Sequence, residues 1–194
     1  MRRRAENPSG GRARSPRRIL AVTLAAWLVA AGAPFALLVS AQGVAEPQLK
    51  AAFLFNFVKF ATWPEDLLPA GAPIVLCATD DDIAASLESL VAGRSVDSHA
   101  LVVKRVKLNA SARGCAVLYA GRIDQRRAKE LFTALDGTSV LTVGDAEDFA
   151  TAGGMIGLFV DGGRMRFAIN IGAVERTQVR LSAQLLNLAK IIKG

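Results

Sequence analysis

An uncharged apolar run near the N-terminus divides this 194-residue chain into two parts of different character. Residues 19–39 carry no charged side chain and are dense in Ala, Leu and Val, and seven arginines precede them. Residues 39–41 then read Val-Ser-Ala, with small or modest side chains at the two positions that a signal peptidase reads. This order predicts a secretory signal over residues 1–41 and a single folded domain over residues 42–194.

The same run of 21 residues is long enough to cross a hydrocarbon core, so a permanent membrane anchor is the alternative. Gly32 and Pro34 interrupt the run, which favours cleavage. In both cases the positive flank stays inside, and we therefore expect the remainder to lie outside the cytoplasm, in the bacterial periplasm.

The net charge of +7 belongs largely to the basic opening. Residues 42–194 hold 17 basic and 16 acidic side chains, which leaves a net charge of +1. A folded domain with so little excess charge lacks the electrostatic basis for binding a phosphate backbone. We therefore expect no nucleic-acid partner.

Two cysteines, Cys77 and Cys115, remain in the predicted domain. In an oxidising compartment such a pair favours a disulfide, and two buried free thiols are the alternative. The spacing is not Cys-x-x-Cys and no histidine is near, so neither redox catalysis nor zinc binding is indicated.

Helical and strand patterns alternate after residue 45, which predicts an α/β domain with a mixed sheet flanked by helices. Apolar spacing and acidic caps predict helices over 46–60, 80–91, 124–135 and 182–192, with a short turn over 146–150. Short apolar or alternating runs predict strands over 73–78, 101–107, 115–120 and 139–143, and a C-terminal hairpin over 155–160 and 164–171. We describe this arrangement as an α/β sandwich.

The predicted hairpin turns at Asp161-Gly162-Gly163, where glycine tolerates positive φ. Its second arm alternates and predicts a strand with one wet face, formed by Arg164, Arg166, Ala168 and Asn170. The last helix would bury a stripe of Leu185, Leu188, Ala189 and Ile192.

No combination of residues indicates catalysis. His99, the chain's one histidine, falls in a predicted loop without a nucleophile in a recognisable motif. The acids at 80–82 lack the further Asp of a Mg²⁺ site, and the glycines at 153–157 precede a strand instead of a helix. We expect a protein that is not an enzyme, with no metal and no cofactor.

Several segments taken in order resemble the YfiR-like family of periplasmic regulators. The resemblance rests on five stretches that span the predicted domain: 49–60 closed by Trp63-Pro64, 115–122, 139–143, 153–156, and 166–171 followed by 181–189. It implies an α/β sandwich that is often a homodimer, and it implies a disulfide between Cys77 and Cys115.

Family membership also implies a function. Members of known role bind the periplasmic sensor domain of an inner-membrane diguanylate cyclase and hold it inactive, which lowers cyclic-di-GMP, a regulator of biofilm formation. An OmpA-like outer-membrane lipoprotein can sequester the repressor. Where the family commonly has Phe-Glu-Ile-Asn, this chain has Ala168 in place of the acid.

The candidate partner-binding residues are Phe57, Arg166 and Ala168, in the aromatic helix and on the wet face of the hairpin. A second hypothesis is a periplasmic protein that binds a small ligand without a cyclase partner. Its pocket would lie beyond the carboxyl ends of the strands, where Asp80, Asp81 and Arg122 are the candidate lining residues.

Overall fold

The computed structural model describes residues 45–194, except residue 109. The predicted secretory signal, residues 1–41, lies outside the described residues. Residues 42–194 form a compact unit. Within the described range, no helix combines the length and the apolar character that a membrane crossing requires.

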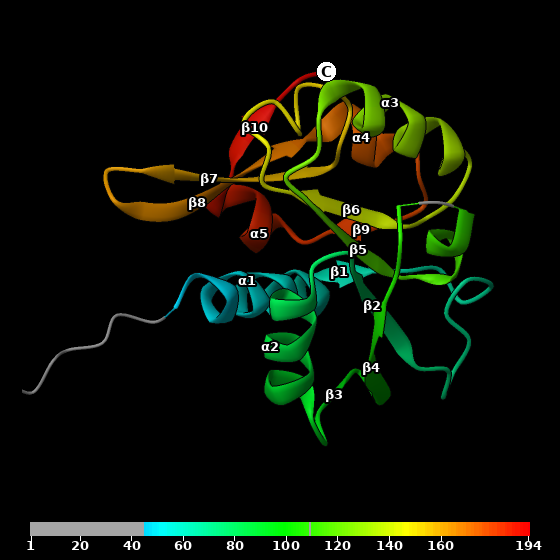
Figure 1. Ribbon diagram of the computed structural model, residues 1–194. Helices are drawn as coiled ribbons and strands as arrows, with labels where there is room; N and C mark the ends of the chain where they lie inside the picture. The colour runs from blue at the N-terminus through cyan, green and yellow to red at the C-terminus, as the bar shows by residue number, and fades with distance from the viewer. Residues whose placement is uncertain (1–44, 109) are drawn as a thin grey trace, which may run out of the picture. The chain divides into compact units, whose positions relative to one another are not determined.

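The described residues form an eight-stranded mixed sheet in the order β10-β8-β7-β6-β5-β2-β4-β3 (Figure 1). The neighbours from β4 to β7 run parallel, whereas β3 pairs with β4, and β8 with β7, antiparallel. The strands are β2 (Ile74–Ala78), β3 (Ser95–Val96), β4 (His99–Arg105), β5 (Val117–Gly121), β6 (Leu141–Gly144), β7 (Ile156–Asp161), β8 (Arg164–Asn170) and β10 (Lys190–Ile192). The predicted fold class, one α/β domain with a mixed sheet flanked by helices, is confirmed.

The helices are α1 (Glu46–Phe60), α2 (Asp81–Val91), α3 (Gln125–Ala134), α4 (Ile171–Glu175), α5 (Ala183–Leu188) and the short 3₁₀ helix η1 (Ala110–Gly114). A two-stranded antiparallel pair, β1 (Ala61–Thr62) with β9 (Arg180–Leu181), joins the end of α1 to the segment before α5. The predicted acidic caps are present: Asp80 and Asp124 each accept a backbone N–H at 2.9 Å, from Ile83 and Arg127 respectively.

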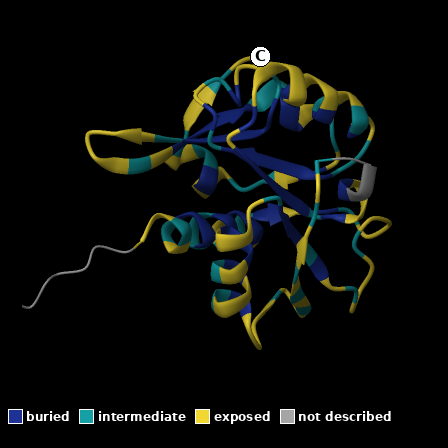
Figure 2. Cartoon of the chain, viewed as in Figure 1, coloured by how far each residue is buried: buried dark blue, intermediate teal, exposed yellow. Residues whose placement is uncertain are grey.

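The sheet separates two hydrophobic cores. The first core contains residues of α1, α2, α4 and α5, and the second contains residues of η1, α3 and the loop between β6 and β7. Successive residues of the central strands alternate between them: Leu76 belongs to the first core, and Cys77 and Leu118 to the second. Because helices cover both faces, the central strands are largely buried and appear dark blue in Figure 2.

The predicted hairpin between β7 and β8 is confirmed. Its turn residues Gly162 and Gly163 have φ of +55° and +73°, and Asp161 pairs directly with Arg164. The predicted wet face holds only for the outer part of β8, where Arg164 and Arg166 are exposed. From Phe167 onward every residue of β8 is buried, including Ala168 and Asn170, because β10 and the β6–β7 loop cover that end.

The prediction of one helix over 182–192 is wrong. Helix α5 ends at Leu188, Ala189 is extended, and Lys190–Ile192 forms β10, which pairs in parallel with β8. Pairing with the open edge of β8 gives backbone hydrogen bonds to residues that would otherwise end the helix in solvent. Leu188 is consequently 68% exposed and does not join a buried stripe.

The disulfide between Cys77 and Cys115 is confirmed, with 5.8 Å between the two Cα atoms. Cys77 lies in β2, and Cys115 lies two residues before the neighbouring parallel strand β5. Both residues are buried in the second core, where the bond joins β2 to the segment after η1.

Reducing this disulfide is expected to destabilise the domain by about 4 kcal/mol, because the bond closes a loop across a sequence separation of 38 residues. The melting temperature should fall by on the order of 10 °C. Thermal unfolding with and without dithiothreitol measures the change. The double variant C77A/C115A serves as the control, since reductant should leave its melting temperature unchanged. Equal melting of oxidised and reduced wild type would contradict the expectation.

Candidate functional site

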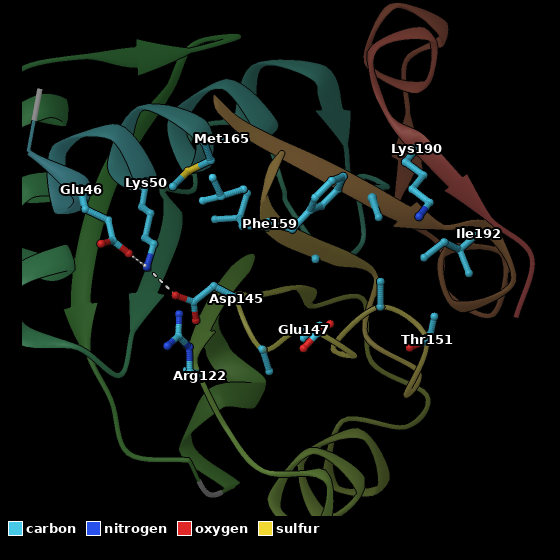
Figure 3. A pocket seen from close by; sticks show the side chains of 16 residues that line it. Glu46, Lys50, Arg122, Asp145, Glu147, Thr151, Phe159, Met165, Lys190 and Ile192 are labelled. Carbon is cyan, nitrogen blue, oxygen red and sulfur yellow. Dashed lines mark hydrogen bonds and ion pairs between the residues drawn. The ribbon is translucent and has the colours of Figure 1, made fainter. Parts of the chain in front are cut away.

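A groove of about 740 Å³ lies on the second face of the sheet, at its β7–β8–β10 end. Its walls come from the start of α1, the residue after β5, the β6–β7 loop and three strands (Figure 3). Among the described residues, no member of β7, β8 or β10 belongs to the second core. The groove therefore lies where the cover over this face of the sheet ends.

The β6–β7 loop, residues 145–155, forms one wall of the groove. The ring of Phe149 fills the space beside two glycines: a Cβ at either Gly144 or Gly154 would lie 2.3 Å from a ring carbon. A Cβ at Gly157 would lie 3.2 Å from the Cβ of Ala150. The amide of Asn170 donates to the carbonyl of Ala150 at 2.7 Å. Glycines at these positions let the loop lie directly on the strands and hold it in place.

A buried ion pair crosses from α1 to this loop. Lys50 donates a short hydrogen bond to Asp145 Oδ2, and both side chains are only 9% exposed. Glu46, one turn earlier in α1, lies 2.6 Å from the same ammonium and is 66% exposed. The pair connects residues that are 95 positions apart in the chain.

Burial and hydrogen bonding fix the ionisation states of Lys50 and of the neighbouring Tyr119. Burial opposes the charged form of Lys50, but its hydrogen bonds with Asp145 and Glu46 prevail and raise its pKa above the ordinary value. Burial, followed by the negative charge of Asp145, raises the pKa of the neighbouring Tyr119 phenol. At neutral pH Lys50 is therefore an ammonium and Tyr119 is un-ionised.

One oxygen of this cluster has no donor. Within the described residues Asp145 Oδ1 is buried and accepts no hydrogen bond. A buried acceptor without a partner costs about 1–3 kcal/mol, more when it is charged. Asp145 lines the groove, and Figure 3 shows Arg122 extending towards its carboxylate from the end of β5.

The structure does not bring the predicted partner-binding residues together. Phe57 is 0% exposed and packs edge-to-face on Phe167, with ring centroids 5.1 Å apart. Ala168 is 5% exposed, at the floor of the groove. The prediction that Phe57 and Ala168 lie on a free surface is therefore wrong, because Phe57 packs into the first core and β10 pairs with β8 at Ala168. Arg166 has a side chain that is 56% exposed, and its role stays a prediction.

The residues predicted to line a ligand pocket also lie in different parts of the structure. Asp80 caps α2, and Asp81 lies 3.4 Å from Arg105, so neither lines the groove, whereas Arg122 does. His99 is held by its Nδ1, 2.7 Å from the carbonyl of Ala72. Among the described residues, no group of three or more His, Cys, Asp or Glu side chains is arranged to hold a metal ion.

Sequence reasoning missed Lys50 and Asp145. The available signal was a lysine on a helix that is otherwise apolar on most sides, between Leu49 and Ala51. A buried lysine requires a partner, but nothing in the sequence identifies Asp145 as that partner.

Removing one member of the ion pair should leave a buried charge without its partner. We expect K50M or D145L alone to lower the free energy of unfolding by about 3–5 kcal/mol, and the double variant K50M/D145L to lose less than the sum. Urea unfolding of the four proteins measures the coupling. The control is E46Q, which touches the same ammonium from the exposed side and should cost under about 1 kcal/mol. Strict additivity would show that the pair is not coupled.

Comparison with known proteins supplies the family. A solved structure described as a conserved domain protein from Vibrio cholerae O1 biovar El Tor strain N16961 aligns with a TM-score of 0.48 and 16% identity. The alignment covers 76% of this chain and 60% of that chain, so this protein spans less than two thirds of the other's length. A family profile described as YfiR/HmsC-like matches residues 47–190. The resemblance inferred from the sequence is thereby confirmed, and the chain belongs to the YfiR/HmsC-like family.

Proposed function

We propose that this protein is a periplasmic regulator that binds the periplasmic sensor domain of an inner-membrane diguanylate cyclase and represses it. The observation that carries the proposal is the family match over residues 47–190. Repression would lower cyclic-di-GMP and act through contact, without a reaction catalysed by this chain.

The oxidised pair Cys77–Cys115 supports a periplasmic location, because structural disulfides persist in oxidising compartments. The predicted signal over residues 1–41 is the second support, although it lies outside the described residues. His99 is a poor candidate for a catalytic base, because its Nδ1 is already engaged by the carbonyl of Ala72. This favours action by contact.

The surface best suited to a partner is the hairpin arm, which we define as residues 159–166. It extends from the body of the domain beyond the helices and is largely exposed (Figures 1 and 2). Val160, near one end of this arm, is 68% exposed. Arg166 and Asp161 form an ion pair of 3.1 Å on the opposite face of the hairpin, with side chains 56% and 64% exposed. Exposed apolar and charged side chains together are typical of a contact surface.

Two further partners are part of the proposal. An OmpA-like outer-membrane lipoprotein would sequester the repressor, and a homodimer would be the form that engages the cyclase. Both are expectations that the resemblance to the YfiR-like family implies. The edge strand β10 offers free backbone groups through which a second chain could associate.

The variants V160S and R166E are expected to weaken binding to the cyclase sensor domain at least tenfold without loss of fold, because both side chains are exposed on the hairpin arm. Biolayer interferometry between the secreted protein and periplasmic domains of the host's membrane diguanylate cyclases gives the dissociation constants. The matched control is R126E on α3, which makes the same change of charge at a side chain 78% exposed.

Wild-type binding followed by equal loss in R126E would indicate a nonspecific charge effect and remove the hairpin arm from the proposal. If the folded, oxidised wild type binds and inhibits none of the host's cyclases, the repressor function itself is wrong.

A further inference from the structure

We propose that the groove at the β7–β8–β10 end of the sheet binds a small dipolar molecule, with an amine at one end, a flat apolar body and an acidic group at the other. Phe159, Val160 and Met165 of the hairpin arm also line this groove, but the proposal does not rest on the contact function.

A row of small residues crosses the sheet at the groove, and Gly157 and Ala168 of this row line it. Register places Lys190 beside Ala168, Ala168 beside Gly157, and Gly157 beside Gly144. Register partners in neighbouring strands share one face of a sheet. The row therefore runs across four strands, with a charged side chain at its β10 end and three residues with a methyl group or less after it.

Charges of opposite sign stand at the two ends of this row. Lys190 is its last member at the edge of the sheet, and Asp145 follows Gly144 directly at the other end. The backbone positions of Lys190 and Gly144 lie three inter-strand spacings apart, which is roughly 14 Å. Figure 3 shows Asp145 and Lys190 at opposite sides of the groove.

At the Asp145 end one buried acceptor lacks a hydrogen-bond donor. Lys50 occupies Oδ2, but Oδ1 has no partner within the described residues, and the side chain is nine-tenths buried. An ammonium N–H that reached this oxygen from the groove, which Asp145 lines, would supply the missing donor. Three acidic side chains, Glu46, Asp145 and Glu147, line the groove against two basic ones at this end, Lys50 and Arg122, so acidic groups prevail there.

The middle of the groove suits a flat apolar body. Its floor is Ala168, with Ala150 packed on Gly157, and such short side chains leave a shallow, level surface. Phe159 and Ile192 stand at its sides. Phe159 also lies 5.9 Å from the Lys190 ammonium, which fixes an aromatic ring and a positive charge at one place. An aromatic acid would contact both.

The probe for this site is 4-(aminomethyl)benzoate, which carries an amine and a carboxylate on opposite sides of one ring. Benzylamine and benzoate each supply one half of it. The full chain, expressed with its signal and purified from the periplasm, is titrated with each compound by NMR and calorimetry. We expect the dipolar probe to bind at least tenfold more tightly than either half.

Single variants test which end of the groove binds the carboxylate and which binds the amine. K190M should reduce the affinity for the dipolar probe to the level of the affinity for benzylamine. It should leave the affinity for benzylamine unchanged. D145N should weaken both compounds. K129M, an exposed lysine on α3, is the matched control and should change neither. Because D145N disturbs the buried ion pair, F159A provides a second test that leaves the pair intact, and it should weaken the dipolar probe and benzoate together.

The proposal is overturned if the dipolar probe binds no more tightly than benzylamine, or if K190M and F159A leave its affinity unchanged. Resonance changes confined to residues outside the groove would overturn it equally. Inhibition of a cyclase by protein that binds none of the probes would leave the proposed repressor function standing while refuting this site.

Discussion

Burial of the central strands on both faces is the constraint on which the rest of this structure depends. Strands β2, β5 and β6 are buried along almost their whole length and are stable only when both sides are shielded from water. Helices α1 and α2 shield one side, while α3, η1 and the β6–β7 loop shield the other. The disulfide lies within the second core and joins the sheet, at β2, to the segment after η1.

The functional surfaces begin where that shielding ends. Beyond β6 the second face carries only the loop at residues 145–155, and the groove opens next to it. Farther out, the strands β7 and β8 leave the body as the exposed hairpin arm. One end of a single sheet thus provides a concave surface suited to a small molecule and a projecting surface suited to a protein.

Lys50 and Asp145 connect these regions. Their ion pair attaches the start of α1 to the loop that forms the groove wall, across a sequence separation of 95 residues. A buried pair contributes little net stability over an apolar contact, but it fixes which segments meet. The orphan oxygen of Asp145 then lies beside the groove, because the loop is held there by Phe149 against Gly144 and Gly154.

The sequence by itself determined the fold class, most elements, the hairpin turn and the family, because these follow from local periodicity, capping residues and glycines with positive φ. It also identified the cysteine pair. Only the tertiary structure decided that Lys190–Ile192 pairs with β8 instead of extending α5, since an open strand edge is not visible in a local pattern. Burial of Phe57 and Ala168, and the meeting of Lys50 with Asp145, depend in the same way on contacts between segments far apart in the chain.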